Sequence, residues 1–324
     1  RRVKARKEVI LSASAVHTPK ILMLSGIGPK EHLEEHGIEV KVDLPGVGSN
    51  LQDHTFLHLY FNAKNGSITQ GEALSVRSLL NYYLRKRGTL TRTGLEGTAF
   101  VRTREGLPYP DLQLHFVSSL GSSSDSTNLG HAEGGERGAA AFHGWNRNDE
   151  SFDIAPTLLH PGTTGTVRLK SSSPSEPPAV DPRYLDHPDD MKTYLAGVRL
   201  ALSIAKTPIM RPHTDGLPRV LRGVCEGSPC GCPPSDPEAK DFDERWECVV
   251  RAAASTVYHP AGTAKMGRSS DRMAVVDSRL RVFGVRGLRV VDASVMPTIT
   301  SGNTNAPTIM VAEKASDMIK EDLA

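Results

Sequence analysis

A histidine in a loop rich in glycine and proline is the first residue of this sequence that is suited to chemistry. His259 stands in the segment YHPAGTAKMG, where Gly262 and Gly267 permit the backbone to approach a planar ligand closely. An imidazole is the side chain best suited to remove a hydroxyl proton near neutral pH. Taken alone, however, a histidine followed by proline in a loop is more often structural or exposed than catalytic.

A second candidate is the polar turn SGNTNAPT, which contains Asn303 and precedes a predicted helix over 308–319. Asn305 is a good N-cap residue, and Pro307 suits the first turn of a helix. The free N–H groups and the dipole at such a helix start would stabilise a nearby negative charge. An ordinary capped helix explains the same residues, and physical chemistry alone favours that simpler explanation.

Short strand and helix signals in the first fifty residues predict an α/β layer. KEVILSA (7–13) has the β-branched and apolar composition of a buried strand, and Thr18-Pro19 predicts the start of a short helix that ends at Gly26. A second helix closes at Gly37, and EVKVDLP then alternates like a strand. This order of strand, helix and strand is typical of the α/β class.

The middle of the chain predicts a mainly antiparallel sheet with flanking helices. Strands with period-two alternation are expected at 57–63, 111–117 and 166–170. Helices are expected at 78–86, in the amphipathic segment that follows Asp189, and at 244–257. The polar stretch 118–147 is expected to be a loop over the sheet or a lid. In the helix over 308–319, we expect one apolar face to pack on the sheet, formed by Ile309, Ala312, Ala315 and Ile319.

Composition excludes several functional classes. The 324 residues suffice for two domains, and a net charge of +2 argues against a nucleic-acid-binding protein. No run approaches the ~20 apolar residues of a transmembrane helix. The four cysteines lack the C-x2-C pairs of a zinc site, so no metal site is predicted. They fit either free thiols or one or two disulfides. Disulfides would favour an oxidising, secreted location, and free thiols would leave the location unknown.

Several segments resemble the glucose–methanol–choline (GMC) family of flavoprotein oxidoreductases. SASAVHTPKILMLSGIG resembles the second signature of that family, and LPGVGSNLQDH follows it as it does there. YHPAGTAKMG and LRVVDASVMPTITSGNTNAPTIMVAEKASDMI resemble the C-terminal block of the family, and TVRLKSS and DPRYLDHPDD resemble its middle part. The resemblance covers essentially the whole chain and is nearest to animal glucose-dehydrogenase-like and choline-dehydrogenase-like members.

The resemblance implies FAD as cofactor and assigns roles to residues of this chain. His259 matches the catalytic base, which removes the substrate hydroxyl proton as hydride leaves for flavin N5. Asn303 matches the second catalytic position, which is His or Asn in the family and bonds the substrate oxygen. Positions that line the flavin and its ribityl–phosphate arm fall on Tyr258, Asp292, Ala293, Thr304 and Asn305.

The chain also departs from the family pattern. The N-terminal G-x-G-x-x-G signature is absent, so residues 1–55 and 258–324 are expected to form an incomplete FAD-binding domain around a substrate-binding domain at 56–257. We therefore expect this chain to be the C-terminal part of a longer enzyme and to be inactive alone. Members that oxidise choline carry Glu shortly after the DH pair, where this chain has Phe56.

These observations predict FAD-dependent oxidation of an alcohol or sugar hydroxyl. The expected partners are that small-molecule substrate and an electron acceptor, which is oxygen, a quinone or another molecule. Two alternatives remain. One is a non-redox relative that keeps the flavin, of the cyanohydrin lyase type, and the other is a truncated, flavin-free remnant without activity.

Overall fold

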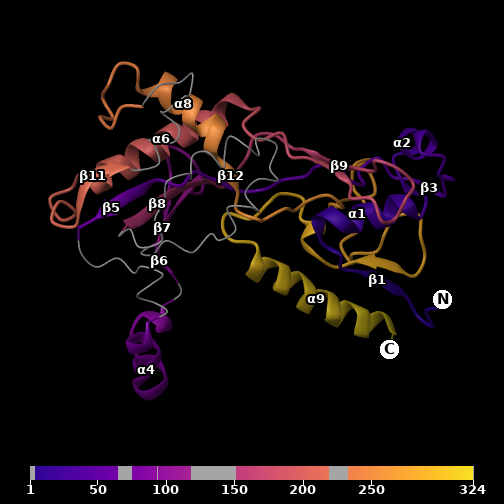
Figure 1. Cartoon of the computed structure of the whole chain (residues 1–324). Coiled ribbons are helices and arrows are strands. Elements are labelled where there is room, and N and C mark those ends of the chain that lie inside the picture. Colours follow the sequence, from indigo (N-terminus) through magenta and orange to yellow (C-terminus); the bar gives the residue numbers. More distant parts are fainter. Residues whose placement is uncertain (1–3, 65–74, 93, 118–150, 219–232, 324) are drawn as a thin grey trace. The chain divides into compact units, whose positions relative to one another are not determined.

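A computed structural model describes residues 4–64, 75–92, 94–117, 151–218 and 233–323 (Figure 1). The chain divides into two compact units. Unit 1 comprises Arg1–His54, Pro161–His187 and Tyr258–Ala324, and unit 2 comprises Thr55–His160 and Pro188–Val257. Residues 161–187, which the sequence placed in the middle domain, thus pack within unit 1. The loop or lid predicted at 118–147 lies outside the described residues.

Unit 1 is built from short strands and helices around one apolar core. Strand β1 (Val9–Leu11) pairs in parallel with β13 (Leu288–Val290), and β2 (Ile27–Gly28) pairs in parallel with β3 (Val42–Asp43). β9 (Thr166–Arg168) pairs with β10 (Ala179–Asp181) in an antiparallel ladder. The helices are α1 (Ser14–Leu24), α2 (Lys30–Glu35), the 3-10 turn η3 (Ala293–Val295) and α9 (Asn305–Leu323). The core gathers apolar side chains from these elements and from the loops between them, among them Leu22, Leu33, Val47, Val275 and Val290.

Helix α1 begins earlier than the sequence predicted, at Ser14 rather than at Pro19, which lies inside the helix. Two contacts explain the difference. Thr18 Oγ1 accepts the N–H of Ala13 at 3.0 Å, and Asp292 Oδ2 accepts the N–H of Ser14 at 3.1 Å. Because N–H groups at a helix start need partners, this distant carboxylate fixes a boundary that local composition does not reveal.

The segment 166–170 was wrongly expected in the main antiparallel sheet. Its strand β9 pairs with β10, and the N–H of Val167 donates to the carbonyl of Gly48 at 2.7 Å. Gly165 and Leu51 form a backbone bridge beside it. These bonds hold β9 in unit 1.

The C-terminal helix is predicted correctly in type and approximate position, but its packing differs. Ala315 is buried, whereas Ile309 and Ala312 are exposed. Ala315 packs in the apolar core of unit 1, and α9 contacts the turn η3.

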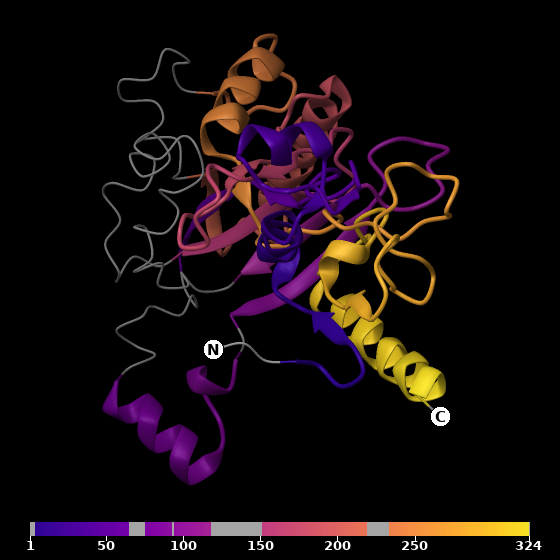
Figure 2. The ribbon, with the colours of Figure 1, turned by 90° about the vertical axis from the view of Figure 1, so that its right-hand side faces the viewer.

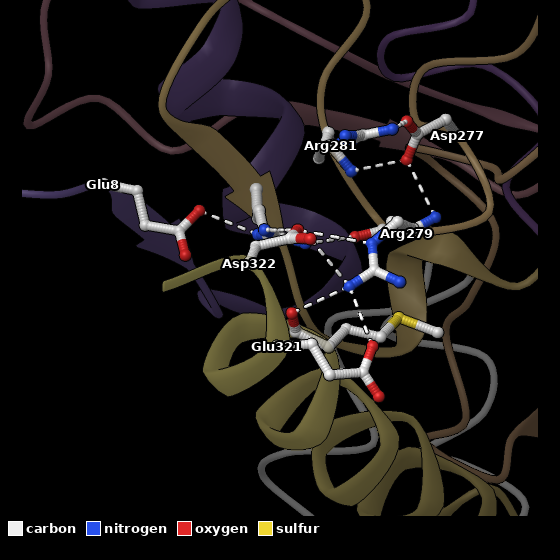
Figure 3. A network of polar contacts seen from close by, with 8 residues as sticks. Glu8, Asp277, Arg279, Arg281, Glu321 and Asp322 are labelled. Carbon is white, nitrogen blue, oxygen red and sulfur yellow. Dashed lines mark hydrogen bonds and ion pairs between the residues drawn. The ribbon is translucent and has the colours of Figure 1, made fainter. Parts of the chain in front are cut away.

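Charged side chains around the buried Arg289 connect the end of α9 to the β1–β13 ladder. The Arg289 guanidinium, with a side chain only 4% exposed, bonds Glu8 at 2.7 Å and Asp322 at 2.5 Å. Arg279 bonds Glu321 and Asp322, and Arg281 pairs with Asp277 beside it (Figure 3). This network fixes the C-terminal turn of α9 through polar contacts.

Unit 2 contains an open antiparallel sheet with helices on it. The strand order is β11 (Thr214–Pro218), β5 (Tyr60–Ala63), β8 (Ser151–Leu158), β4 (Thr55–Phe56) and β12 (Ser255–Thr256). β7 (Leu112–Val117) also pairs with β8, and β6 (Leu95–Val101) pairs with β7. Along residues 56–61, buried positions alternate with partly exposed ones, which confirms the predicted period-two pattern.

Helix α6 (Pro188–Ala205) covers the sheet and confirms the predicted amphipathic helix. It buries Tyr194, Val198 and Leu202 completely. Gly197 lets it approach the strands, because an added Cβ there would lie 2.8 Å from Pro156. Helix α8 (Phe242–Ala253) packs against α6 and buries Trp246 and Val249 (Figure 1).

Helix α4 (Val76–Arg85) confirms the helix predicted at 78–86, and it is followed by the 3-10 turn η1 (Thr89–Thr91). Figures 1 and 2 both show α4 standing apart from the sheet of unit 2. Its only buried residue is Ser78, whose N–H is capped by Ser75 Oγ at 3.2 Å.

Candidate active site around His259

The loop that carries His259 is fixed by backbone pairing with the segment NLQDH (50–54) of the same unit. Gln52 and Ala261 exchange both of their backbone hydrogen bonds, at 3.0 and 2.8 Å. Gly262 follows with φ +89°, and an added Cβ would lie 2.5 Å from the Asn50 carbonyl oxygen. Only glycine combines this conformation with this close approach. Of the two glycines that the sequence singled out, Gly262 therefore serves the packing of this loop on 50–54, whereas a Cβ added at Gly267 would lie 2.8 Å from Ala274.

The same segment braces the chain that leads to Asn303. The Gln52 amide accepts the N–H of Ile299 at 3.1 Å and donates to the carbonyl of Pro297 at 3.2 Å. Asn50 donates to the carbonyls of Gly262 and Pro297 at 3.1 and 3.2 Å. Residues 50–54 thus hold together the two loops that carry His259 and Asn303.

Asp53 anchors the backbone of His259. Its Oδ1 accepts the N–H of His259 at 2.9 Å, and its Oδ2 accepts the Tyr184 hydroxyl at 2.5 Å. Asp53 is buried, and Tyr258 just before His259 adopts φ +62° in the left-handed region. The carboxylate therefore holds the main chain in a conformation that non-glycine residues rarely adopt.

The imidazole of His259 lies between His54 and Asn303. Its Nδ1 is 3.0 Å from Nδ1 of His54, and the two rings meet edge to face with centroids 5.2 Å apart. Its Nε2 is 3.4 Å from the Asn303 amide nitrogen. Burial lowers the pKa of His259 because desolvation disfavours the charged ring. The two residues that the sequence singled out are thus brought into contact, with a neutral imidazole favoured between them.

Asp292 organises the neighbouring turn. Its Oδ2 accepts from the Ser14 N–H and from Thr18 Oγ1 at 3.1 and 2.6 Å. Its Oδ1 accepts from the backbone N–H and the hydroxyl of Ser294 at 2.9 and 2.5 Å. Both oxygens are therefore used to tie the start of α1 to η3. A direct contact of Asp292 with a flavin stays a prediction.

The other predicted cofactor residues surround the same loops. Tyr258 is exposed, and the Ala293 carbonyl accepts the N–H of Gly262 at 3.2 Å. Thr304 is buried and its carbonyl accepts the N–H of Thr308 at 3.0 Å, so Asn305 is the first helical residue of α9 rather than its cap. Their contacts with a cofactor stay predictions.

The chemistry of these donors fits the ring edge of FAD. The start of α9 offers N–H groups and the positive end of a long helix dipole, and Asn303 and Asn305 add amide donors beside it. Electron-rich carbonyl and nitrogen atoms of an isoalloxazine edge are suitable acceptors for such a set. The described residues of unit 1 thus fit the flavin end of the cofactor.

Sequence reasoning missed Asp53, His54 and Tyr184 as site residues. The signal was present in the LQDH and DPRY segments, but these were read only as family markers. The contact of His54 with His259 joins residues 205 positions apart, and that of Asp53 with Tyr184 joins residues 131 apart. Periodicity within either segment carries no information about such pairs.

Three further findings concern the cysteines, metal sites and helices of the described residues. Cys248, the one cysteine within the described residues, is disulfide-bonded, which agrees with the disulfide alternative. Within the described part of the chain, no three His, Cys, Asp or Glu side chains are grouped to hold a metal ion. None of the helices described there has the length and apolar character of a membrane span.

Comparisons with known proteins point to one family. Glucose dehydrogenase [FAD, quinone] of Drosophila melanogaster is 35% identical over 323 residues, which cover 99% of this chain and 48% of the relative. Choline oxidase of Arthrobacter globiformis is 38% identical over 98% of this chain and 50% of its own length. Alcohol dehydrogenase [acceptor] of Pseudomonas putida is 37% identical, with 98% and 52% covered. The chain thus spans about half the length of the curated relatives it matches.

Solved structures agree with this result. A formate oxidase variant of Aspergillus oryzae RIB40 superposes with a TM-score of 0.79 at 26% identity, covering 98% of this chain and 55% of that one. A fungal aryl-alcohol oxidase gives a TM-score of 0.74 at 25% identity, with 99% and 56% covered. Family models described as GMC oxidoreductase match residues 1–56 and 161–312. This chain belongs to the GMC oxidoreductase family.

Proposed function

We propose that this chain provides the catalytic base and the flavin-ring side of an enzyme that oxidises the hydroxyl of a neutral alcohol or sugar with FAD. The observation that carries the proposal is the position of His259, whose ring nitrogens contact His54 and Asn303 at 3.0 and 3.4 Å. A half-buried neutral imidazole beside an amide donor is the arrangement that proton removal from a hydroxyl requires.

His259 would hold the base nitrogen, Nε2, and take the proton of the substrate hydroxyl. Asn303 would donate its amide hydrogen to the same substrate oxygen and stabilise the negative charge that develops there. Removal of one such donor commonly costs ~3–4 kcal/mol of transition-state stabilisation. FAD, when bound, would accept the hydride from the substrate carbon. Tyr258, Ala293, Thr304 and Asn305 would line the flavin, and Asp292 would keep the α1 and η3 backbones in place.

The proposed substrate class rests on Phe56, which stands where members of the family that oxidise choline carry Glu. Phe56 contacts the His58 ring at a centroid distance of 4.2 Å, and His58 stacks on Tyr60 at 5.1 Å. The Asp153 carboxylate beside them is buried and bonds His58 and the N–H of Leu59 at 2.5 and 2.9 Å. Both oxygens of the Asp153 carboxylate therefore already bond protein groups, and Asp153 does not replace the missing Glu as a partner for a cation. We therefore favour a neutral hydroxyl compound over a quaternary ammonium as substrate.

The disulfide of Cys248 favours an oxidising compartment, so we propose a secreted or otherwise extracellular location. The electron acceptor is oxygen, a quinone or another small molecule. The relative named glucose dehydrogenase [FAD, quinone] uses a quinone by its name.

Anaerobic mixing of the holoenzyme that contains this chain with a panel of alcohols and sugars tests the proposal. Loss of the visible flavin absorbance with at least one neutral alcohol or sugar is the expected result. If a yellow protein keeps its absorbance with every compound but cleaves cyanohydrins, the lyase alternative holds. A colourless protein to which added FAD does not bind would identify a remnant without flavin chemistry.

A further inference from the structure

His54 is a buried histidine whose ring nitrogen faces the proposed base. It is 0% exposed, and its Nδ1 lies 3.0 Å from Nδ1 of His259. Two imidazole nitrogens at this distance share a single hydrogen, so one ring donates and the other accepts. The direction of this hydrogen bond decides which nitrogen of His259 keeps a lone pair.

The contact of His259 with Asn303 fixes that direction. The Asn303 amide nitrogen is a donor with no acceptor capacity, and it lies 3.4 Å from His259 Nε2. In the neutral ring, Nε2 must then be unprotonated and Nδ1 must carry the hydrogen. His259 is therefore the donor, and Nδ1 of His54 is the acceptor.

We propose that His54 is a positioning residue for the reaction: it accepts the Nδ1 hydrogen of His259 and thereby keeps the lone pair of His259 at Nε2. This inference rests on the proposed function of His259 as base. In the step itself, the substrate O–H bond breaks, the proton joins the Nε2 lone pair, and the Nδ1–H bond to His54 stays intact. The opposite tautomer would place a hydrogen on Nε2 and leave no base there.

The surroundings of His54 support a positioning role. His54 follows Asp53 directly, and Asp53 holds the His259 backbone N–H at 2.9 Å. Two adjacent residues thus fix the main chain and the ring of His259 together. The Asp53 carboxylate also accepts from Tyr184, and the titratable side chains that hydrogen-bond to His259 include His54 and Asp53. As an uncharged acceptor at Nδ1, His54 orients the ring of His259. A carboxylate in the same place would also strongly stabilise the protonated form of His259.

Selective ¹⁵N labelling of histidine in the holoenzyme tests the tautomer directly. Its signals are compared in the parent and in His54→Leu, with the His259 signal assigned by its loss in His259→Gln. The expected parent spectrum shows a neutral His259 with protonated Nδ1 and unprotonated Nε2, and His54→Leu shifts the ring towards the Nε2-protonated form. A parent His259 with protonated Nε2 would overturn the inference, whether or not the enzyme oxidises alcohols.

Kinetics then separate positioning from folding. We expect kcat/KM to fall by about 10–100-fold in His54→Leu, a part of the ~10²–10⁴-fold that a general base contributes. His54→Asn, which can present its side-chain oxygen to Nδ1–H, should recover most of that loss. His32→Asn is the matched control, because this histidine of unit 1 accepts the Leu169 N–H at 3.0 Å and contacts no site residue through it. Equal kcat/KM in His54→Leu and the parent would contradict the inference while leaving the role of His259 intact.

Discussion

The backbone N–H of His259 donates to Asp53 at 2.9 Å, across 206 positions of the sequence. The second oxygen of the same carboxylate accepts the Tyr184 hydroxyl at 2.5 Å. One buried side chain therefore sets the place of the proposed base by holding its main chain. The adjacent His54 holds its ring.

Asp53→Ala should reduce both stability and activity. It leaves the His259 N–H without this acceptor, which costs ~1–3 kcal/mol in the free energy of unfolding, and kcat should fall more than KM rises because the base moves. Tyr184→Phe removes one donor but keeps the bond to His259, so its cost should be ~1 kcal/mol with kcat nearly unchanged. Denaturant unfolding and steady-state kinetics measure both. Equal damage by the two substitutions would show that Asp53 does not act through His259.

The pH dependence of kcat/KM should follow the neutral form of His259. Burial lowers the pKa of this ring below its ordinary value of 6.5. Because the base must be unprotonated, kcat/KM rises with pH through the lowered pKa and is level above it. The midpoint of the acidic limb should therefore lie below pH 6.5 with a substrate that does not ionise. A midpoint of the acidic limb at or above pH 6.5 would show that the group titrating in the pH profile is not a half-buried His259.

Gly262→Ala should displace the loop that carries His259. The added Cβ would lie 2.5 Å from the Asn50 carbonyl oxygen at a φ of +89°. We expect a loss of more than ~2 kcal/mol in the free energy of unfolding and a clear drop in kcat, because strain and a backbone clash combine. Gly37→Ala is the control, since Gly37 has φ +67° but open space around it. It should cost ~1 kcal/mol and leave kcat unchanged, and a similar result for Gly262→Ala would refute the close-packed loop.

The Arg289 network should contribute to stability far from the proposed chemistry. Arg289→Met leaves Glu8 and the Asp322 end of α9 without this partner, and the Arg289 side chain is only 4% exposed. We expect a loss of ~2–4 kcal/mol in the free energy of unfolding. This is at the low end for a broken buried ion pair, because Asp322 is partly exposed. Arg281→Met breaks a more exposed pair with Asp277 and should cost below ~1 kcal/mol. Thermal unfolding should show the loss of stability in Arg289→Met. The rate of flavin reduction by substrate, measured as a second readout, should stay at the parental value.

Much of the fold follows from local patterns in the sequence. Period-two alternation of residue types predicts β7, although its residues 112–115 are all buried, and amphipathic spacing predicts α6, whose apolar face is buried. Alternation does not predict β8, because all of its residues are buried and SFDIAPTL shows no alternation. Pro156 within it also argues against a strand. The short strands of unit 1 are set by partners distant in sequence, such as Val9 with Leu288.

The candidate site also has one part that the sequence predicts and one part that it does not. The contact between His259 and Asn303 is anticipated because both stand in motifs that resemble one family. The brace from Asn50, Gln52, Asp53 and His54 depends on pairings across more than two hundred positions, which no single-sequence spacing contains. The early start of α1 has the same origin, because its first N–H is satisfied by Asp292.

The rate of anaerobic flavin reduction in His259→Ala tests the central claim most directly. Absorbance is followed after the FAD-loaded parent and variant are mixed with the best alcohol or sugar substrate. The account predicts that the variant still carries FAD and is reduced about 10²–10⁴-fold more slowly than the parent, the usual contribution of a general base. Reduction of the variant at the parental rate would remove His259 from the mechanism and, with it, the site described around it.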